Sequence, residues 1–189
     1  IMRISMFEKA RKTSDLIQCL SNIFRYNLGG TGKEVLLEEE LDMIKEYICI
    51  QQVRFGSRVD FSIVSRADIS NVLIQRFILQ PLVENAIVHG LEPKEAGGMV
   101  RIKIYKKLDE TMIKIIDNGI GMSKDQLGKT LSGPNETACH RGHTTGIGIC
   151  NVKDRLMLYY KDARCFGIKS RPGMGTVITI RIIKNPEVQ

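Results

Sequence analysis

An apolar segment with polar residues along one edge reads Leu79-Gln80-Pro81-Leu82-Val83-Glu84-Asn85-Ala86-Ile87-Val88-His89-Gly90. Its apolar residues recur at helical spacing, which predicts a helix that buries one face. Asn85 and His89 are four residues apart, so they share a face of that helix, with Glu84 beside them. A magnesium ion that holds phosphates takes oxygen ligands, and the amide of Asn85 can supply one. Taken alone, the pattern favours a structural polar patch.

Three motifs that contain glycine follow along the chain. Asp117-Asn118-Gly119-Ile120-Gly121 comes directly after a predicted strand, where a carboxylate can accept a hydrogen bond from an exocyclic amine such as that of adenine. Thr144-Thr145-Gly146-Ile147-Gly148 leads into a predicted helix, whose free amide groups suit a phosphate. Gly173-Met174-Gly175-Thr176 opens the last predicted strand. Each motif alone also fits an ordinary turn.

The remaining sequence predicts a helical hairpin followed by strands and helices. Apolar residues at helical spacing predict helices over residues 3–28 and 37–55, and leave open what their apolar stripes pack against. The strands expected are residues 59–64, 99–107, 112–117, 165–170 and 176–182, and the further helices are residues 71–91 and 148–160. Pro81 is expected to bend or restart its helix. Residues 118–145 lack periodicity and predict a long functional loop.

Composition restricts the function classes. The formal charge of +7 and the isoelectric point near 9.2 suit an anionic partner such as a nucleotide, a nucleic acid or a lipid headgroup. Nucleic acid is disfavoured because the chain has no tryptophan, only 6% aromatic residues and no zinc-finger spacing. The sequence has no apolar run of the roughly 18 residues that a membrane span needs. Five cysteines without a CxxC pair are expected to be free thiols in a reducing cytosol.

The four motifs, in this order, resemble the N, G1, G2 and final glycine boxes of the GHKL ATPase superfamily. Residues 79–86 and 148–156 resemble the LytS/YesM-type sensor histidine kinases in particular, and residues 37–55 are similar to the segment that links the dimerisation helices of that family to its ATP domain. The resemblance implies an α+β fold, namely a two-layer α/β sandwich with a mixed, mainly antiparallel sheet after a helical hairpin. The implied division is a helical segment over residues 1–56 and an ATP-binding domain over residues 57–189.

The resemblance also implies roles for individual residues. Asp117 would bind the adenine amine, with Thr176 helping through a water, and Asn85 would hold magnesium. Glu84 would polarise water or orient the ligands of the metal, so Glu84 and Asn85 are the implied catalytic residues. The further residues implied to contact ATP are His89, Gly119, Gly121, Thr144, Thr145, Gly146, Ile147 and Gly148. Residues 118–145 would form a lid over the phosphates.

The activity that the resemblance implies is transfer of the γ-phosphate of Mg-ATP to a histidine. Kinases of this family usually carry that histidine in a Pro-His-Phe-x-x-Asn motif, which the sequence lacks. The histidines present are His89, His140 and His143, and none has the surroundings of an acceptor. The acceptor is therefore expected outside this chain, and the helix over residues 3–28 would correspond to the second dimerisation helix.

The implied partners are ATP, a response regulator with a receiver domain, and a second copy of the full-length kinase in a homodimer. The implied location is the cytoplasmic portion of a membrane-anchored bacterial sensor, without direct contact between this segment and the membrane. Two alternatives stay open from the sequence: a nucleotide-sensing module without kinase activity, and a serine kinase of the anti-sigma-factor type from the same superfamily.

Overall fold

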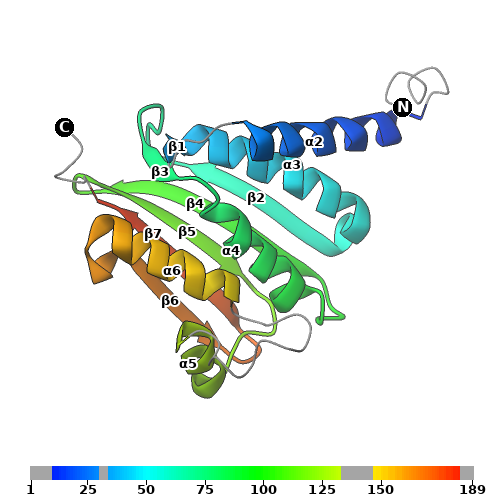
Figure 1. Cartoon of the computed structure of the whole chain (residues 1–189). Coiled ribbons are helices and arrows are strands. Elements are labelled where there is room, and N and C mark those ends of the chain that lie inside the picture. Colours follow the sequence, from blue (N-terminus) through cyan, green and yellow to red (C-terminus); the bar gives the residue numbers. More distant parts are fainter. Residues whose placement is uncertain (1–9, 30–33, 133–146, 184–189) are drawn as a thin grey trace.

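The computed structural model describes residues 10–29, 34–132 and 147–183, and its centre is a five-stranded sheet in the order β2-β4-β5-β7-β6 (Figure 1). The strands are β2 (Val59–Ser65), β4 (Gly98–Lys107), β5 (Glu110–Asp117), β6 (Phe166–Arg171) and β7 (Gly175–Ile182). β2 pairs with β4 in parallel, and the other neighbours are antiparallel. The expected mixed, mainly antiparallel sheet is confirmed.

Helices cover one face of this sheet (Figure 1). The α-helices are α2 (Arg11–Leu28), α3 (Leu37–Phe55), α4 (Leu79–Asn85), α5 (Lys124–Ser132) and α6 (Ile147–Tyr160). A π-helical segment, η2 (Ala86–Leu91), continues α4, and short 3-10 helices lie at η1 (Gly56–Arg58) and η3 (Ala163–Cys165). Two short strands, β1 (Glu34–Leu36) and β3 (Leu73–Gln75), form a separate antiparallel pair.

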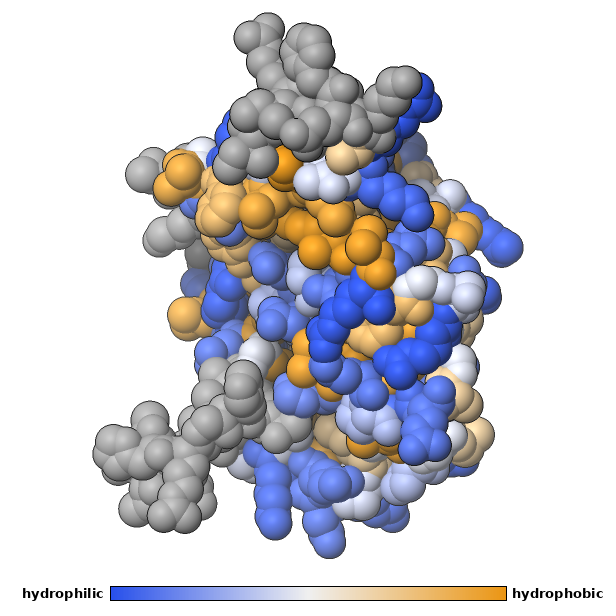
Figure 2. All heavy atoms as spheres, turned by 90° about the vertical axis from the view of Figure 1, so that its right-hand side faces the viewer, coloured by the Kyte–Doolittle hydropathy of each residue, from blue (hydrophilic) through white to orange (hydrophobic). Residues whose placement is uncertain are grey.

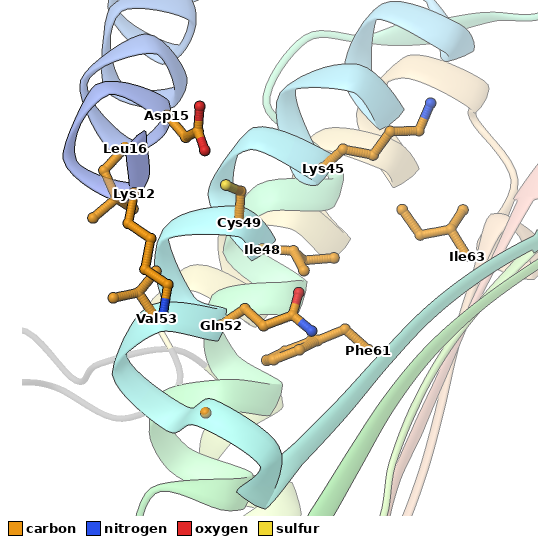
Figure 3. A pocket seen from close by; sticks show the side chains of 11 residues that line it. Lys12, Asp15, Leu16, Lys45, Ile48, Cys49, Gln52, Val53, Phe61 and Ile63 are labelled. Atoms are coloured by element: carbon orange, nitrogen blue, oxygen red, sulfur yellow. The ribbon is translucent and has the colours of Figure 1, made fainter. Parts of the chain in front are cut away.

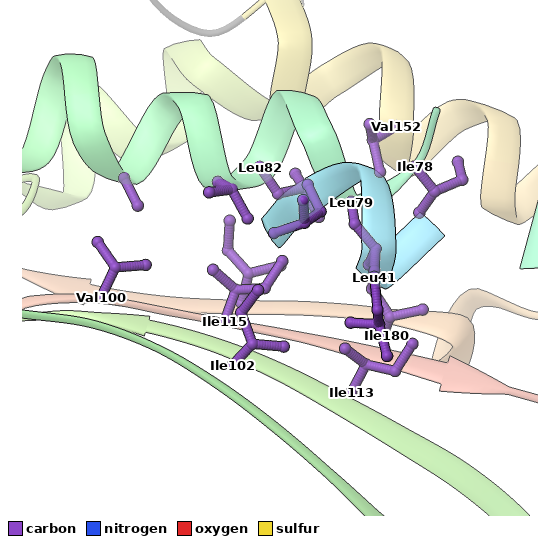
Figure 4. Close-up of a cluster of buried hydrophobic side chains, with 14 of the residues drawn as sticks. Leu41, Ile78, Leu79, Leu82, Val100, Ile102, Ile113, Ile115, Val152 and Ile180 are labelled. Carbon is purple, nitrogen blue, oxygen red and sulfur yellow. The ribbon is translucent and has the colours of Figure 1, made fainter. Parts of the chain in front are cut away.

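The core lies between the helices and the sheet (Figure 4). Alternate residues of the strands point inward because side chains alternate between the two faces of a strand. The inward residues are Val100, Ile102, Ile104, Ile113, Ile115, Ile178 and Ile180, each at most 3% exposed. They meet fully buried helical residues that include Leu79, Leu82, Ile149 and Leu156. This packing fixes α4 and α6 against one face of the sheet.

The first two helices differ in their surroundings. α3 belongs to the same core, because Leu37 and Ile44 are fully buried in it. α2 packs on α3, and its Leu20 and Phe24 remain 46% and 54% exposed. The helical hairpin of α2 and α3 therefore buries one apolar stripe between its two helices, and α3 buries another against the sheet. The division of the chain at residue 56 stays a prediction.

A groove lies between α2, α3 and β2, with Leu16, Ile48 and Phe61 among its lining residues (Figure 3). Seen from the right-hand side of Figure 1, the largest group of apolar side chains lies in the upper part of the molecule, at the height of α2 and α3, and the lower part is mainly polar (Figure 2). In the described part of the chain, no helix is long and apolar enough to reach across a membrane.

Two predictions of secondary structure were wrong. The helix expected over residues 71–91 begins only at Leu79, because Leu73–Gln75 forms β3 and pairs with β1. A short apolar run fits a strand or a helix, and here pairing with a distant strand decides between them.

Pro81 lies in the first turn of α4, where a residue has no intrahelical acceptor for its N–H, so the missing N–H of proline costs no hydrogen bond. The loop expected over residues 118–145 contains α5, and residues 133–146 lie outside the described part.

Truncation of a helix residue that faces the sheet tests this packing. Leu82 is fully buried, so Leu82→Ala is expected to lower the free energy of unfolding by about 2–5 kcal/mol. Leu108 is 90% exposed in the turn between β4 and β5, and Leu108→Ala should change it by less than about 0.5 kcal/mol. Urea denaturation of both variants measures the difference, and similar losses would contradict the described core.

Candidate functional site

The site is built around a contact between two backbone segments. The amide of Ile120 donates to the carbonyl of Gly90, with 2.9 Å between N and O. A Cβ on Gly119 would lie 2.3 Å from the same carbonyl oxygen, so a larger residue cannot occupy this position without moving the helix. Gly90 belongs to the π-helical segment that continues α4, and such segments are frequent at functional sites. The loop after β5 is thereby held against the helix that carries Asn85.

Asp117 ends β5 beside this contact and is only 6% exposed. Its Oδ1 accepts from the amides of Gly119 at 2.9 Å and Thr176 at 3.2 Å. Burial raises the pKa of Asp117, although these two hydrogen bonds and the charge of Lys94 act to lower it. Among the described residues no hydrogen bond reaches Oδ2. The carboxylate is thus fixed by one oxygen and keeps the other as an acceptor.

The loop after Asp117 also rests on the turn between β6 and β7. Gly121 has a φ of 64°, and a Cβ there would lie 1.9 Å from the carbonyl oxygen of Arg171, so glycine is required. The Ser170 hydroxyl accepts from the amide of Met122 at 2.8 Å and lies 2.9 Å from the Thr176 hydroxyl. Thr176 is 5% exposed and is the cross-strand partner of Asp117. The predicted residues Asp117, Gly119, Gly121 and Thr176 therefore lie together.

The polar residues of the helix follow one another along α4 and η2. Glu84 is exposed, while Asn85 and His89 are partly exposed. Within the described residues none of these three side chains makes a hydrogen bond, so each is available to a ligand. No three His, Cys, Asp or Glu side chains of the described residues form a group that could hold a metal ion. The single amide of Asn85 fits magnesium, which commonly takes one or two protein ligands and completes its shell with water and phosphate oxygens.

The remaining predicted residues belong to the start of α6. Ile147 is the first residue of this helix and Gly148 the second. A Cβ on Gly148 would lie 3.4 Å from Cβ of Pro81, so the start of α6 lies against the first turn of α4. Thr144, Thr145 and Gly146 lie outside the described residues.

The structure adds residues that the motifs did not single out. Lys94 donates to the carbonyl of Asn118 at 2.8 Å, which places a positive charge near Asp117. The Asn118 side chain accepts from the amide of Met99 at 2.7 Å and so holds the loop to β4. Ser170 supports Thr176 and Met122, as described above. Asn118 and Gly90 lie within the motifs quoted above, whereas Lys94 and Ser170 gave no signal in the sequence.

Two family models match the chain. Residues 72–186 match the family of histidine kinase-, DNA gyrase B- and HSP90-like ATPases, and residues 1–59 match the histidine kinase family. The chain belongs to the first of these families, whose model covers more than half of it, and its first 59 residues are similar to the histidine kinase family.

Individual relatives agree with this family. The chain is 33% identical over 167 residues to an uncharacterized sensor-like histidine kinase from Staphylococcus epidermidis, and 30% identical over 167 residues to the sensor protein kinase HptS from Staphylococcus aureus. These matches cover 88% of this chain in both cases. They cover 32% and 31% of the two relatives, so the chain spans about a third of their length.

Solved structures of low sequence identity share the fold. The catalytic domain of histidine kinase ThkA aligns with a TM-score of 0.57 at 16% identity, over 82% of this chain and 97% of that domain. ThkA has also been solved in complex with the response regulator protein TrrA. That structure aligns with a TM-score of 0.53 at 18% identity, over 95% of this chain and 50% of that chain. The expected α/β sandwich after a helical region is confirmed.

The raised pKa of Asp117 predicts a dependence of stability on pH. A carboxyl group whose pKa is raised by folding contributes stability below the pKa of an unfolded aspartate and loses it as the pH rises through the folded value. Asp117→Asn keeps an acceptor oxygen but does not titrate. The free energy of unfolding of this variant, relative to the original chain, should therefore increase from about pH 4 to about pH 7. Urea titrations across this range measure the difference, and a constant or falling difference would contradict the assignment.

Proposed function

We propose that this chain binds Mg-ATP between η2, β5, β7 and the start of α6 and, as the catalytic core of a sensor histidine kinase, transfers the γ-phosphate to a histidine. One observation carries the proposal: Asp117 is buried and fixed through one oxygen, next to the point where two glycine backbones touch. Its other oxygen, Oδ2, accepts no hydrogen bond from the described residues and so is available to a ligand. Adenine, with an exocyclic amine and a flat ring, matches both features.

The orientation of the nucleotide follows from the positions of the polar groups. The adenine amine would donate to Asp117 Oδ2, and Thr176 would reach the ring through a water. The phosphates would extend toward Asn85 and the start of α6, where free helix amides favour negative charge. His89, one turn beyond Asn85, would lie near the phosphates. Thr144, Thr145 and Gly146 are proposed to complete this side of the pocket.

The transfer step needs positioning and charge neutralisation more than covalent chemistry. The lone pair of an imidazole nitrogen attacks the γ-phosphorus, the bond from that phosphorus to the bridging oxygen breaks, and its electron pair leaves with ADP. The phosphorylated imidazole then releases its ring proton to solvent. Bound magnesium would neutralise the charge on the phosphate oxygens. Asn85 would hold the metal, and Glu84 would orient its water ligands.

The proposed partners follow from the family. Because none of His89, His140 and His143 has the surroundings of an acceptor, the receiving histidine is proposed to lie on another segment or chain. A response regulator with a receiver domain would take the phosphate next, by analogy with the regulator bound to ThkA. The full-length kinase is proposed to be a homodimer anchored in the membrane, with this segment on the cytoplasmic side.

Exchange of the Asp117 carboxylate for an amide tests adenine recognition. In Asp117→Asn the remaining oxygen can still accept from Gly119 and Thr176, so the amide NH₂ would face the adenine amine. Two donors would then oppose each other, and affinity for Mg-ATP should fall about 10- to 100-fold. Calorimetry with ATP and with the inosine nucleotide, which lacks the amine, measures this effect. Equal ATP affinity, or an unchanged preference between the nucleotides, would show that Asp117 does not read adenine.

Loss of the proposed metal ligand tests the kinase reaction. The chain is mixed with labelled ATP, magnesium and a separate polypeptide that bears a Pro-His-Phe-x-x-Asn acceptor helix. Asn85→Ala should lower the rate of labelling about 100-fold. Asn71→Ala, in an exposed turn before β3, should leave the rate unchanged. Nucleotide binding without any transfer to the acceptor would favour the nucleotide-sensing alternative.

A further inference from the structure

A fully buried carboxylate lies on the helix that precedes the sheet. Glu40 of α3 is 0% exposed. Its Oε1 accepts from the amide of Phe77 at 2.7 Å, and its Oε2 accepts from the amides of Ile78 and Leu79, each at 3.2 Å. The hydroxyl of Tyr26, on α2, also donates to Oε1. A buried charge is tolerated only when it is well hydrogen-bonded, and these four donors supply the bonds.

These hydrogen bonds cap the start of α4. The first amides of a helix have no intrahelical acceptor, and the residue before α4, Ile78, has no side chain that can cap them. Glu40 provides the missing acceptor from 39 residues earlier in the chain than Leu79. Its negative charge also suits the positive end of the helix dipole. A local cap stabilises a helix wherever the helix lies, whereas this cap fixes α4 relative to α3.

The segment before α4 is held from a second side. Phe77 has a φ of 60°, which is uncommon for a bulky residue. Arg155 of α6 donates to the carbonyls of Arg76 at 2.6 Å and Phe77 at 3.3 Å. The turn that enters α4 is therefore bound by α3 on its amide side and by α6 on its carbonyl side.

The C-terminal turn of α2 contacts the same segment. The guanidinium group of Arg76 donates to the carbonyls of Tyr26 and Gly29. It also lies 4.2 Å from the centre of the Tyr26 ring, and the rings of Tyr26 and Phe77 meet edge to face at 5.4 Å. The end of α2 is thus joined to the start of α4 through Tyr26, Glu40 and Arg76.

We propose that Glu40 is a positioning residue of the nucleotide site, which sets the place of Asn85 relative to Asp117. This inference rests on the proposed function. α4 has only seven residues, so a shift at Leu79 reaches Asn85 within two turns. The far end of the same segment is fixed by the contact between Gly90 and Gly119. Asn85 lies between these two fixed points, and Tyr26 makes its position depend on α2.

Three variants separate positioning from general stability. Glu40→Gln removes the charge, and Tyr26→Phe removes one hydroxyl while it retains the ring contacts. Glu39→Gln, an exposed neighbour in the same helical turn, is the control. Affinity for Mg-ATP is measured by calorimetry well below the melting temperature of each variant. Affinity should fall about fivefold or more in Glu40→Gln, should fall less in Tyr26→Phe, and should be unchanged in the control.

Amide hydrogen exchange distinguishes a positioning role of Glu40 from a contribution to overall stability alone. Bound Mg-ATP should slow exchange at residues 77–79 in the original chain, and should slow it less in both variants. If Glu40→Gln does not fold, the affinity of Tyr26→Phe for Mg-ATP tests the inference instead. Affinities of the folded variants equal to that of the original chain would overturn the inference.

A chain that binds no Mg-ATP would refute the proposed function instead. In that case exchange at residues 85–90 still tests the positioning role. Faster exchange there in Glu40→Gln than in the control would support it, and equal exchange would overturn it.

Discussion

The backbone contact between Gly90 and Gly119 is the constraint on which the site depends. It joins the end of a helix to the end of a central strand at a distance that no side chain on Gly119 would allow. Asp117 lies two residues before this contact, and Asn85 lies five residues before it on the helix side. The relative position of a carboxylate and an amide, from elements far apart in the sequence, is therefore fixed by backbone atoms.

The rest of the molecule holds the two sides of this contact in place. The buried isoleucines of β4, β5 and β7 carry the helical layer, and the pairing of Asp117 with Thr176 aligns the loop with β7. Glu40 fixes the other end of α4, where local residues offer no cap. Burial raises the pKa of Asp117, so this carboxylate costs stability at neutral pH. A group retained at such a cost is typical of a binding site.

The order of the five central strands and of α2, α3, α4 and α6 could be predicted from the sequence, because long periodic segments such as residues 37–55 and 148–160 carry their own signal. The helix α5 was missed, since its segment shows no clear apolar periodicity. The β1–β3 pair could not be predicted either, since three-residue strands such as Leu73–Gln75 form only when a distant partner is present. The motifs indicated Asp117, Gly119, Gly121 and Thr176, and the structure brings these four together. Glu40 gave no signal, because its acceptors bond to amides almost forty residues away.

The most direct measurement is a crystal structure of the chain with magnesium and a non-hydrolysable ATP analogue. The account predicts the adenine amine within hydrogen-bond distance of the Asp117 carboxylate, about 2.7–3.2 Å, and the metal bound to the Asn85 side-chain oxygen. A nucleotide bound in another part of the molecule, with neither residue in contact with it, would contradict the account.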